Sequence, residues 1–581
     1  MQTHIRVALT SLLLAGCAVA VPNKSVAPLV LRTWNGQQYA CKTYYDDPTW
    51  PKVAEWKQLN ASVDGNLEVV IPPGASCHNT FQGVRGNVST YNAAKCAEET
   101  AKFADEQWTP TTSPSDPCSL GYYGVYVIIA KTHAHIRTGV LFAKNNGLRL
   151  VLRNTGHDFL GRSVGWGSLV INVHSFKEVT FTDKWDGPGD YKGSAVTVGA
   201  GVQGRELLRL AHAQKPPLAV VVGECPTVGV AGGLPGGGGH GPLTTLKGWA
   251  VDNALEFTVL TASGTILKAN AKSNSDLFWA LRGGGPGAYG VILSATYKTH
   301  LDLPSSGIVL NINSTHTNDT ELFWRGIAAF NKYSNHYSNN GLYVYYVLGL
   351  GSTNLNIQPF VGFNKSATEL TAVVQPLYDD LKSLGLPYDA VTKSFPTLFD
   401  LYIDLFDDEA AGNSALTGGW MFSQTDMATN NDGIIASLRN VINNWGFLIG
   451  HMWNAGHAIP PSKWNDTATH PAFRNASNKL ITTIPLAGNA SLAEKAKAQD
   501  RLTNVIDAGL REAGKSGAAY VNEADPFQPD WQEHFWGREN YDRLVGLKRK
   551  WDPEGTFYAV STPGTEDWVV IEEGTRLCKK L

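Results

Sequence analysis

Two nucleophilic side chains, His157 and Cys225, stand next to glycines in the sequence. His157 directly follows Gly156, and Cys225 lies between Gly223 and Pro226. A neutral imidazole and a thiolate are both nucleophiles that can bond covalently to an electrophilic ring. Each residue also has an ordinary explanation, because a single histidine is usually structural and a cysteine in an oxidising compartment usually forms a disulfide. Whether the two residues bind a cofactor or have a structural role depends on whether the neighbouring segments can bind a cofactor.

The stretch 223–241 contains nine glycines, and those at 236–239 are consecutive. Glycine weakens helices and strands alike, so we predict a loop here. Free N–H groups in such a loop can surround a phosphate. A flexible linker is the alternative, but linkers are polar and rich in serine, whereas Val228, Leu234 and Pro235 interrupt this stretch. The pattern favours a packed loop that cradles a cofactor.

A second glycine motif, Gly199-Ala200-Gly201-Val202-Gln203-Gly204, matches the pattern G-x-G-x-x-G. It follows a predicted strand and opens a predicted helix, and Glu224 lies about twenty residues further on, as in Rossmann dinucleotide-binding units. A tight turn that simply needs glycine is the alternative. His157 and Cys225 are consistent with a covalently held ring instead, and this favours the turn.

A predicted β-α-β unit positions His157. A strand at 125–130 leads to a helix capped by Thr132, the helix stops at 146–147, and a second strand at 148–152 ends shortly before His157. The alternation continues with strands at 195–198 and 219–222, helices at 205–213 and 275–281, and a hairpin that joins 257–260 to 265–268.

Glycine becomes scarcer between about residues 302 and 510, which we interpret as a second domain. Strands such as 341–350 alternate there with amphipathic helices such as 369–382. Near the C-terminus, Asn540 is predicted to cap a helix that ends at Asp552.

The N-terminus predicts secretion. A short apolar run at 7–16 is followed by Ala18-Val19-Ala20, which is typical of a signal peptide cut after Ala20. Nine N-glycosylation sequons agree with this, at Asn23, Asn60, Asn87, Asn313, Asn318, Asn364, Asn465, Asn475 and Asn489. Six cysteines remain after cleavage, and because four of them precede residue 120 we expect an N-terminal disulfide.

The composition excludes several classes of protein. Of 581 residues, 43% are hydrophobic and 17% charged, which rules out a disordered chain. A formal net charge of −3 and the lack of a long basic run argue against nucleic-acid binding. No later segment offers about 18 uninterrupted apolar residues, so we predict no membrane span.

Four segments carry a resemblance to a known family. Residues 153–158 with 161–163 resemble the flavin-histidyl segment of berberine-bridge-enzyme-like oxidases, which belong to the vanillyl-alcohol-oxidase/p-cresol-methylhydroxylase superfamily. The family's cysteinyl, third cofactor and C-terminal segments are similar to 223–232, to 281–291 and to 520–523 with 540–553. The match runs from about 120 to 560 in the family's order, and it is closer to fungal secreted members than to plant ones.

The resemblance implies an α+β fold. A two-part FAD-binding domain of the p-cresol-methylhydroxylase type would accompany a substrate domain, an antiparallel sheet backed by helices. The expected division is a signal peptide at 1–20, an irregular N-terminal segment at 21–117, the FAD-binding domain at 118–301, the substrate domain at 302–510, a C-terminal return to the FAD domain at 511–570 and a tail at 571–581.

The resemblance also implies a bicovalent FAD, bonded through His157 to the 8α carbon and through Cys225 to C6. The motif at 199–204 is then a structural turn, and we predict no metal site. With Cys225 assigned to flavin, five cysteines remain, which predicts at most two intramolecular disulfides and one unpaired thiol. The other residues expected to bind the cofactor are Arg153, Asn154, Thr155, Gly156, Asp158, Gly161, Ser163, Gly223, Thr227, Val228, Gly229, Gly232, Gly236, Gly237, Val291, Tyr520 and Asn522.

The implied reaction is hydride transfer from a carbon bearing oxygen or nitrogen to the flavin, and a general base must take the paired proton. Many relatives carry a Tyr or His directly after the Tyr-x-Asn signature, but this chain has Glu523 there. Glu523 is therefore the candidate base, with an ordinary structural carboxylate as the alternative. Phe159 stands where relatives often have an aromatic hydroxyl, and Val228 matches a position associated with oxygen access.

The leading hypothesis is a secreted FAD oxidase that oxidises an alcohol, sugar or amine and reduces O2 to H2O2. The alternatives are a biosynthetic oxidase that forms a ring or double bond in an alkaloid or polyketide, a dehydrogenase with another acceptor, and a non-catalytic flavin- or sugar-binding protein. We expect a monomer whose partners are a small-molecule substrate and O2, with no nucleic acid and no membrane. The residues that can line a substrate pocket, with buried core as the alternative for each tryptophan, are Trp420, Gln424, His451 and Trp453.

Overall fold

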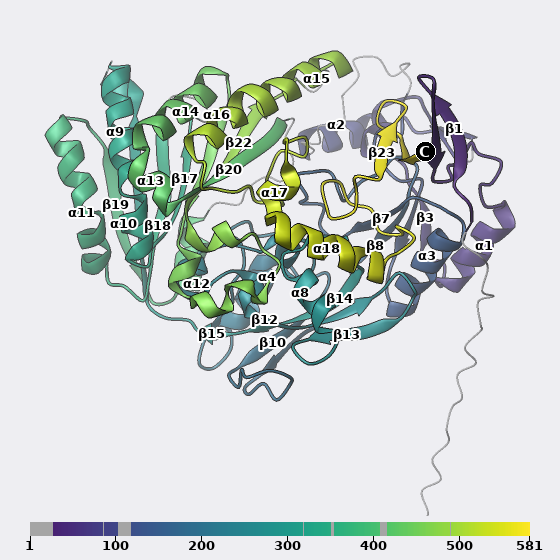
Figure 1. The fold of residues 1–581 in the computed structure, drawn as a ribbon, viewed down its shortest axis with the longest axis horizontal. Coiled ribbons are helices and arrows are strands. Elements are labelled where there is room, and N and C mark those ends of the chain that lie inside the picture. The colour runs from purple at the N-terminus through teal and green to yellow at the C-terminus, as the bar shows by residue number, and fades with distance from the viewer. Residues whose placement is uncertain are drawn as a thin grey trace, which may run out of the picture.

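The computed structural model describes residues 27–84, 86–102, 118–317, 319–349, 354–406, 415–487 and 490–581. The predicted signal peptide lies outside these residues, as do the sequons at Asn23, Asn318 and Asn489. Figure 1 shows the described chain as helices gathered around one large sheet on the left and smaller sheets on the right and below.

The first sheet, called here the parallel sheet, places the loop that carries His157. Its strand order is β3-β6-β8-β7, and β6 and β7 both run parallel to β8 between them. The predicted strand-helix-strand order is found, and Thr132 caps α3 by accepting a hydrogen bond from the His135 N–H at 3.3 Å. The two predicted strands are not neighbours, because β8 inserts between them. The elements are β3 (Leu67–Val69), β6 (Tyr126–Ile129), α3 (His133–Asn145), β7 (Leu150–Arg153) and β8 (Leu169–Asn172).

The second sheet, called the middle sheet, is entirely antiparallel with the order β13-β12-β14-β10-β9. The motif at 199–204 joins β10 to α4, but a Rossmann unit needs parallel strands. A methyl group at Gly199 or Gly201 would overlap the backbone at Phe176 and His174, so the turn needs glycine for close packing. The elements are β9 (Val179–Thr182), β10 (Ala195–Gly199), α4 (Gly204–His212), β12 (Ala254–Leu260), β13 (Ile266–Asn270), α8 (Ser275–Leu281) and β14 (Val291–Lys298).

The strand predicted at 219–222 is shorter than expected. Only β11 (Leu218–Ala219) is paired, with β15 (His300–Leu301), while Val220, Val221 and Val222 are buried without strand pairing. The glycine-rich stretch displaces any partner strand there, since Gly241 packs directly on the Val222 carbonyl.

The large sheet has seven antiparallel strands in the order β19-β16-β18-β17-β21-β22-β20. Figure 1 shows α9, α10, α11, α13 and α14 gathered around it. Its strands are β16 (Ser305–Asn313), β17 (Tyr343–Leu348), β18 (Asn354–Phe363), β19 (Asp389–Phe395), β20 (Ala415–Ser423), β21 (Phe447–Met452) and β22 (Ala476–Pro485). Its helices are α9 (Thr320–Lys332), α10 (Ser334–Asn339), α11 (Ala367–Leu384), α12 (Leu398–Leu405), α13 (Gln424–Thr429), α14 (Asn431–Asn443), α15 (Leu492–Arg501) and α16 (Asp507–Ala513).

The C-terminal helices pack against an element from the first half of the chain. Helix α17 (Trp531–Trp536) leads to α18 (Arg538–Trp551), which packs against α8. The prediction that Asn540 caps this helix is wrong: the helix begins at Arg538 after Gly537, whose φ is +75°. Asn540 lies inside the helix because its side chain donates instead to the Thr469 carbonyl at 3.1 Å.

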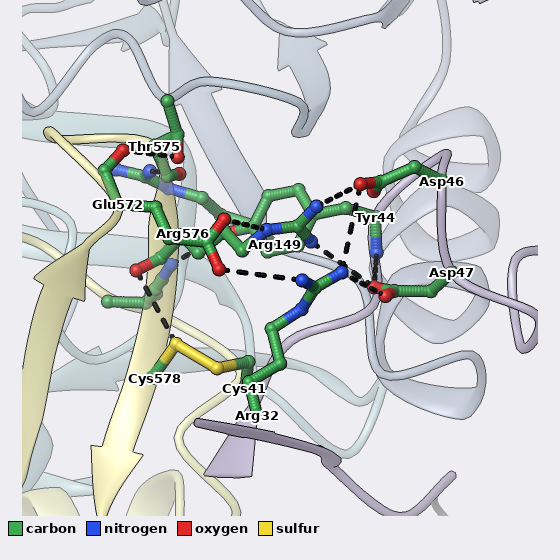
Figure 2. The surroundings of a disulfide bond; sticks show 11 residues. Arg32, Cys41, Tyr44, Asp46, Asp47, Arg149, Glu572, Thr575, Arg576 and Cys578 are labelled. Carbon is green, nitrogen blue, oxygen red and sulfur yellow. Dashed lines mark hydrogen bonds and ion pairs between the residues drawn. A yellow bond between two sulfur atoms is a disulfide. The ribbon is translucent and has the colours of Figure 1, made fainter. Parts of the chain in front are cut away.

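Strands near the beginning and the end of the described chain form a sheet, called here the terminal sheet, with the order β1-β2-β24-β23. The disulfide Cys41–Cys578 joins β2 to β24, and a second disulfide joins Cys77 to Cys96. Figure 2 shows Arg576 beside the first disulfide, paired with Asp46 and Glu572. The predicted maximum of two disulfides is confirmed, and Cys118 lies outside both. The elements are β1 (Val30–Trp34), β2 (Gln37–Cys41), β23 (Trp568–Ile571) and β24 (Arg576–Lys580).

Residues 27–102 are more regular than the prediction of an irregular layer. Their short strands pair with partners far away in the sequence, as β2 does with β24 and β3 with β6, and local periodicity cannot show such pairing. The remaining elements of this layer are α1 (Val53–Ser62), β4 (Thr80–Gly83), β5 (Gly86–Ser89) and α2 (Ala93–Lys102).

Candidate active site

The segments around His157 and Cys225 lie against each other. His157 Nε2 is 2.6 Å from Thr227 Oγ1. Two residues further on, Gly229 packs so closely on Asn154 that a methyl group at Gly229 would overlap the Asn154 Nδ2 atom. Burial lowers the pKa of His157, so its imidazole is neutral at neutral pH. The structure therefore brings the two predicted nucleophilic segments together.

The turn at 199–204 holds the segment that follows Cys225. The Gly204 N–H donates to the Val228 carbonyl at 2.9 Å, and the Arg205 N–H donates to the Pro226 carbonyl at 3.0 Å. The Gln203 side chain donates to the Thr227 carbonyl at 2.9 Å. The first turn of α4 thus uses N–H groups that helix starts leave unpaired to fix the backbone at 226–228.

The C-terminal signature contacts both segments. Arg162 forms an ion pair with Asp158 at 2.6 Å and donates to the Val521 carbonyl at 3.1 Å. Tyr520 Oη accepts hydrogen bonds from the Gly239 N–H at 3.0 Å and from Asn522 Nδ2 at 2.9 Å. The C-terminal return therefore completes the site that the first half of the chain begins.

The glycine-rich stretch is a packed loop, as predicted, because Pro235 to His240 are all buried. It differs from the prediction in containing one short helix, α5 (Gly233–Gly237). This turn is possible because Gly236 and Gly237 pack directly on Pro286 and Asn522, where a side chain would collide.

The residues around this loop fit a bound dinucleotide. Added methyl groups at Gly232 and Gly233 would meet no atom of the described chain within 4 Å, so a ligand can approach the backbone there. Asn522 Oδ1 and Arg162 Nη1 are buried and make no hydrogen bond within the described residues. Buried polar atoms normally have partners, and the oxygen and amino groups of a nucleotide can supply them.

The remaining predicted cofactor residues are spread around these loops. Arg153 folds over Gly156, whose φ is +90°, and Gly161 has a φ of +76°. Val291 lies on β14 opposite Leu260, and its side chain packs into the core beneath the parallel sheet rather than into the loops. Four others stay on the loop segments already described, namely Thr155, Asp158, Ser163 and Gly223.

Five ionisable side chains meet beside the glycine loop, and we call them the carboxylate–histidine cluster: Glu224, His240, His451, Lys479 and Glu523. His240 Nε2 lies 3.3 Å from Glu523 Oε1, and Lys479 forms an ion pair with the same carboxylate. Glu224 Oε1 lies 3.0 Å from His451 Nε2. The cluster joins the loop to β21 and β22 of the large sheet.

Burial controls the protonation of this cluster. It lowers the pKa values of His240 and His451 to about 3 and the pKa of Lys479 well below its ordinary value. Burial opposes ionisation of Glu224, but the neighbouring His451 and His240 hold its pKa below the ordinary range. The two imidazoles are therefore neutral at neutral pH, while Glu224 is charged.

Aromatic rings cover the cluster. Trp453 stacks on His240 with ring centroids 4.6 Å apart, and Tyr343 donates a hydrogen bond to Glu224 Oε2 at 3.1 Å. Of the residues considered for a substrate pocket, His451 and Trp453 thus lie in this site. Trp420 and Gln424 do not: the Trp420 indole donates to the Gly514 carbonyl, and Gln424 pairs with Asn339.

Sequence reasoning missed three members of the site. Glu224 belongs to the predicted cysteinyl segment and to the Rossmann pattern, but neither prediction gives its side chain a role at this site, although it directly precedes Cys225. His240 ends the run of consecutive glycines, which is a usable signal. Lys479 offers none, because it lies in a fully buried strand among apolar and small polar residues.

Comparisons with known proteins identify the class to which this chain belongs. A family model described as FAD binding domain matches residues 125–270, and one described as Berberine and berberine like matches residues 519–560. The FAD-linked oxidoreductase ZEB1 of Gibberella zeae is 37% identical over 552 residues, which cover 93% of this chain and 95% of that protein.

Two further relatives are similar over nearly their whole length. The VAO-type flavoprotein oxidase VAO615 of Thermothelomyces thermophilus is 31% identical over 94% of this chain and 97% of its own. The bifunctional decalin synthase calF of Penicillium decumbens is 31% identical over 98% and 99%. The crystal structure of MtVAO615 from Myceliophthora thermophila C1 matches with a TM-score of 0.84 at 29% identity, over 93% of this chain and 100% of that chain.

The fold and the loops of this site define an FAD-dependent oxidoreductase. The chain belongs to the fungal FAD-linked oxidoreductases of the vanillyl-alcohol-oxidase type, with a berberine-bridge-enzyme-like C-terminal region. The predicted α+β architecture, an FAD-binding domain with a large antiparallel substrate sheet and helices, is confirmed.

Proposed function

We propose that this protein is a secreted oxidase that takes a hydride from a carbon bearing oxygen or nitrogen, in an alcohol, sugar or amine, and passes the electrons to O2 to give H2O2. The observation that carries the proposal is the carboxylate–histidine cluster. Glu224 directly precedes Cys225, and Glu523 directly follows Asn522, so groups able to handle protons lie among the residues predicted to hold the flavin.

Covalent attachment of FAD through both His157 and Cys225 is part of the proposal. Nε2 of His157 contacts Thr227 Oγ1 at hydrogen-bond distance. Nδ1 is therefore the ring nitrogen that we propose for the bond to the 8α carbon. The lowered pKa of His157 supports this, since only the neutral imidazole is nucleophilic. Cys225 takes part in neither disulfide, and its segment contacts that of His157, so its thiol is the proposed group for the bond to C6.

Bound FAD supplies the hydride acceptor, and the side chains of this chain handle the proton. Glu523 is the proposed base that accepts the proton of the substrate hydroxyl or amine. His240 and Lys479 hold its carboxylate in place. The stacked rings of Trp453 and His240 are buried beside it, and a buried surrounding strengthens electrostatic interactions with the reacting groups. Hydride and proton leave together, so the substrate loses two electrons and two hydrogens.

Two observations support secretion. The two disulfides are typical of an oxidising compartment. Four predicted glycosylation sites are exposed, at Asn87, Asn364, Asn465 and Asn475. Among the described residues, no helix is long and apolar enough to cross a membrane.

A biosynthetic oxidase that forms a ring in a secondary metabolite is the second candidate. It is favoured by the similarity to calF, which is named a bifunctional decalin synthase and matches 98% of this chain. In that case the same site would act on a larger polyketide-like substrate.

Anaerobic reduction of the flavin distinguishes these candidates. We expect loss of the oxidised flavin absorbance with at least one member of a panel of oligosaccharides, alcohols and amines, and H2O2 formation with that compound in air. Reduction only by polyketide-like precursors would favour the second candidate. A flavin that no compound reduces would contradict both.

A further inference from the structure

We infer that Glu224, His240 and His451 form a binding site for a divalent transition-metal ion, with Zn²⁺ as the best fit. One ligand atom from each residue lies within 4.8 Å of the other two. His240 and His451 are 4% and 0% exposed. Glu224 and His240 both lie in the stretch 223–241, but His451 lies more than 200 positions further along the chain, so the meeting of all three is visible only in the fold.

The distances suit a small tetrahedral ion. His451 Nε2 and Glu224 Oε1 are 3.0 Å apart. Ligand bonds of about 2.0–2.1 Å to zinc place tetrahedral ligand atoms about 3.3 Å from each other. The distance between these two ligand atoms is therefore close to that of a tetrahedral site, and the third ligand atom lies within 4.8 Å of both.

Outer hydrogen bonds orient two of the three ligands, as metal sites require. Tyr343 donates to Glu224 Oε2 at 3.1 Å, and Glu523 lies 3.3 Å from His240 Nε2. This arrangement leaves Nδ1 of His240 for an ion. That atom is buried and makes no hydrogen bond within the described residues, and a buried polar atom without a partner is costly.

The ligand set selects the ion. Imidazole nitrogens suit zinc, copper, nickel and iron, whereas magnesium and calcium prefer oxygen. Two histidines and one glutamate leave a fourth position open, as in catalytic zinc sites. If the proposed function holds, this open position lies beside the flavin and can polarise a substrate oxygen. Binding of the ion itself does not depend on that function.

Zinc uptake by the flavin-containing protein tests the inference. After removal of metal with a chelator, the protein is incubated with ZnCl2 and gel-filtered, and zinc and flavin are quantified by elemental analysis and absorbance. We expect one Zn²⁺ per chain in the wild type, and loss of this zinc in Glu224→Gln and in His451→Gln. His135→Gln is the matched control and should keep its zinc, because His135 is also buried with Nε2 2.9 Å from a carboxylate, that of Asp64.

A second variant and a second measurement keep the test decisive. Glu523→Gln should weaken zinc binding by about 10- to 100-fold, as for other outer-shell partners. X-ray absorption of the zinc-loaded wild type should show two imidazole ligands. Wild-type protein that takes up no zinc, or zinc bound without imidazole, would overturn the inference. The flavin absorbance is read in the same samples, so failure of metal binding is distinguishable from failure of the proposed oxidase activity.

Discussion

Glu523 stands where many relatives have a tyrosine or histidine, and its role is the sharpest question at the scale of single residues. Replacing Glu523 with Gln keeps the shape but removes the proton acceptor. We expect the rate of anaerobic flavin reduction by substrate to fall by about 100- to 10,000-fold, the usual contribution of a general base. Stopped-flow absorbance of the flavin measures this rate directly.

Glu539→Gln is the control for this change, because Glu539 is an exposed carboxylate in the first turn of α18. Its reduction rate should equal that of the wild type. An unchanged rate in Glu523→Gln would remove Glu523 as the base, whereas a change in flavin content alone would assign it a structural role.

Gly229 is a second residue with a specific expectation. A methyl group there would overlap Asn154, whose Nδ2 donates to the Ala200 carbonyl at 2.8 Å. Gly229→Ala should lower the free energy of unfolding by about 1–3 kcal/mol, the usual cost of overpacking, and should reduce flavin incorporation. Thermal unfolding and the absorbance ratio of flavin to protein measure the two effects.

Gly546→Ala is the matched control. Gly546 lies in the interior of α18, and an added methyl group would meet no described atom within 4 Å. It should raise stability by about 0.5–1 kcal/mol, because glycine is unfavourable inside a helix. If Gly229→Ala and Gly546→Ala had the same stability and the same flavin content, the contact of Gly229 with Asn154 would be unimportant.

Single residues were predictable from the sequence where a family motif carried them. His157, Cys225, Tyr520 and Asn522 are predicted in this way, and the loops that carry them are in contact. Lys479 and Tyr343 were not predictable. Each lies on a buried strand, and the residue pattern of such a strand does not indicate which side chains face a functional site. Only strand pairing within the large sheet brings them to the loop.

At the scale of elements, the contact between α16 and the large sheet depends on one buried carboxyl. Asp507 accepts hydrogen bonds from Thr482 Oγ1 at 2.8 Å and from the Gly419 N–H at 3.0 Å. Burial raises the pKa of Asp507 from 3.8 to about 7, and the hydrogen bonds offset this only in part. At pH values between 3.8 and about 7, Asp507 is therefore protonated more often in the folded state than in the unfolded chain.

This difference predicts how stability changes with pH. Between pH 3.8 and about 7 the folded state binds more protons at Asp507 than the unfolded state, so the free energy of unfolding falls as pH rises through this range. Asp507→Asn should flatten that decline relative to the wild type. Denaturant unfolding at a series of pH values measures it, with the exposed Asp432→Asn as control. The account would be contradicted if the free energy of unfolding fell equally steeply with pH in Asp507→Asn and in the wild type.

Elements with strong local signals were predicted closely. The helix at 275–281 was predicted with the observed bounds, and that at 205–213 was displaced by one residue. The error at Asn540 and the short strand at 219–222 have a common cause: tertiary contacts, to Thr469 and to the glycine loop, outweighed local preference.

At the scale of the whole molecule, the terminal sheet joins strands near the beginning of the described chain to strands near its end. The disulfide Cys41–Cys578 spans 537 residues of sequence, whereas Cys77–Cys96 spans 19. Replacing Cys41 and Cys578 together with serine should lower the free energy of unfolding by about 2–4 kcal/mol, and by more than the same change at Cys77 and Cys96, because longer loops gain more conformational entropy.

Thermal unfolding of both double variants measures this ordering, and the flavin content should stay that of the wild type because the terminal sheet carries none of the predicted cofactor residues. A larger loss from the shorter bridge would contradict the entropic explanation. The pairing itself could not be derived from the sequence, since β2 and β24 meet only when the whole fold closes.

Retention of flavin after acid denaturation tests the central claim, that two side chains bind the FAD covalently. Intact-protein mass spectrometry and in-gel fluorescence of the denatured protein measure it. We predict a yellow, fluorescent wild type whose mass is raised by one FAD, retention of flavin in His157→Ala and in Cys225→Ala alone, and loss in the double variant. A colourless denatured wild type at the mass of the bare chain would contradict the account.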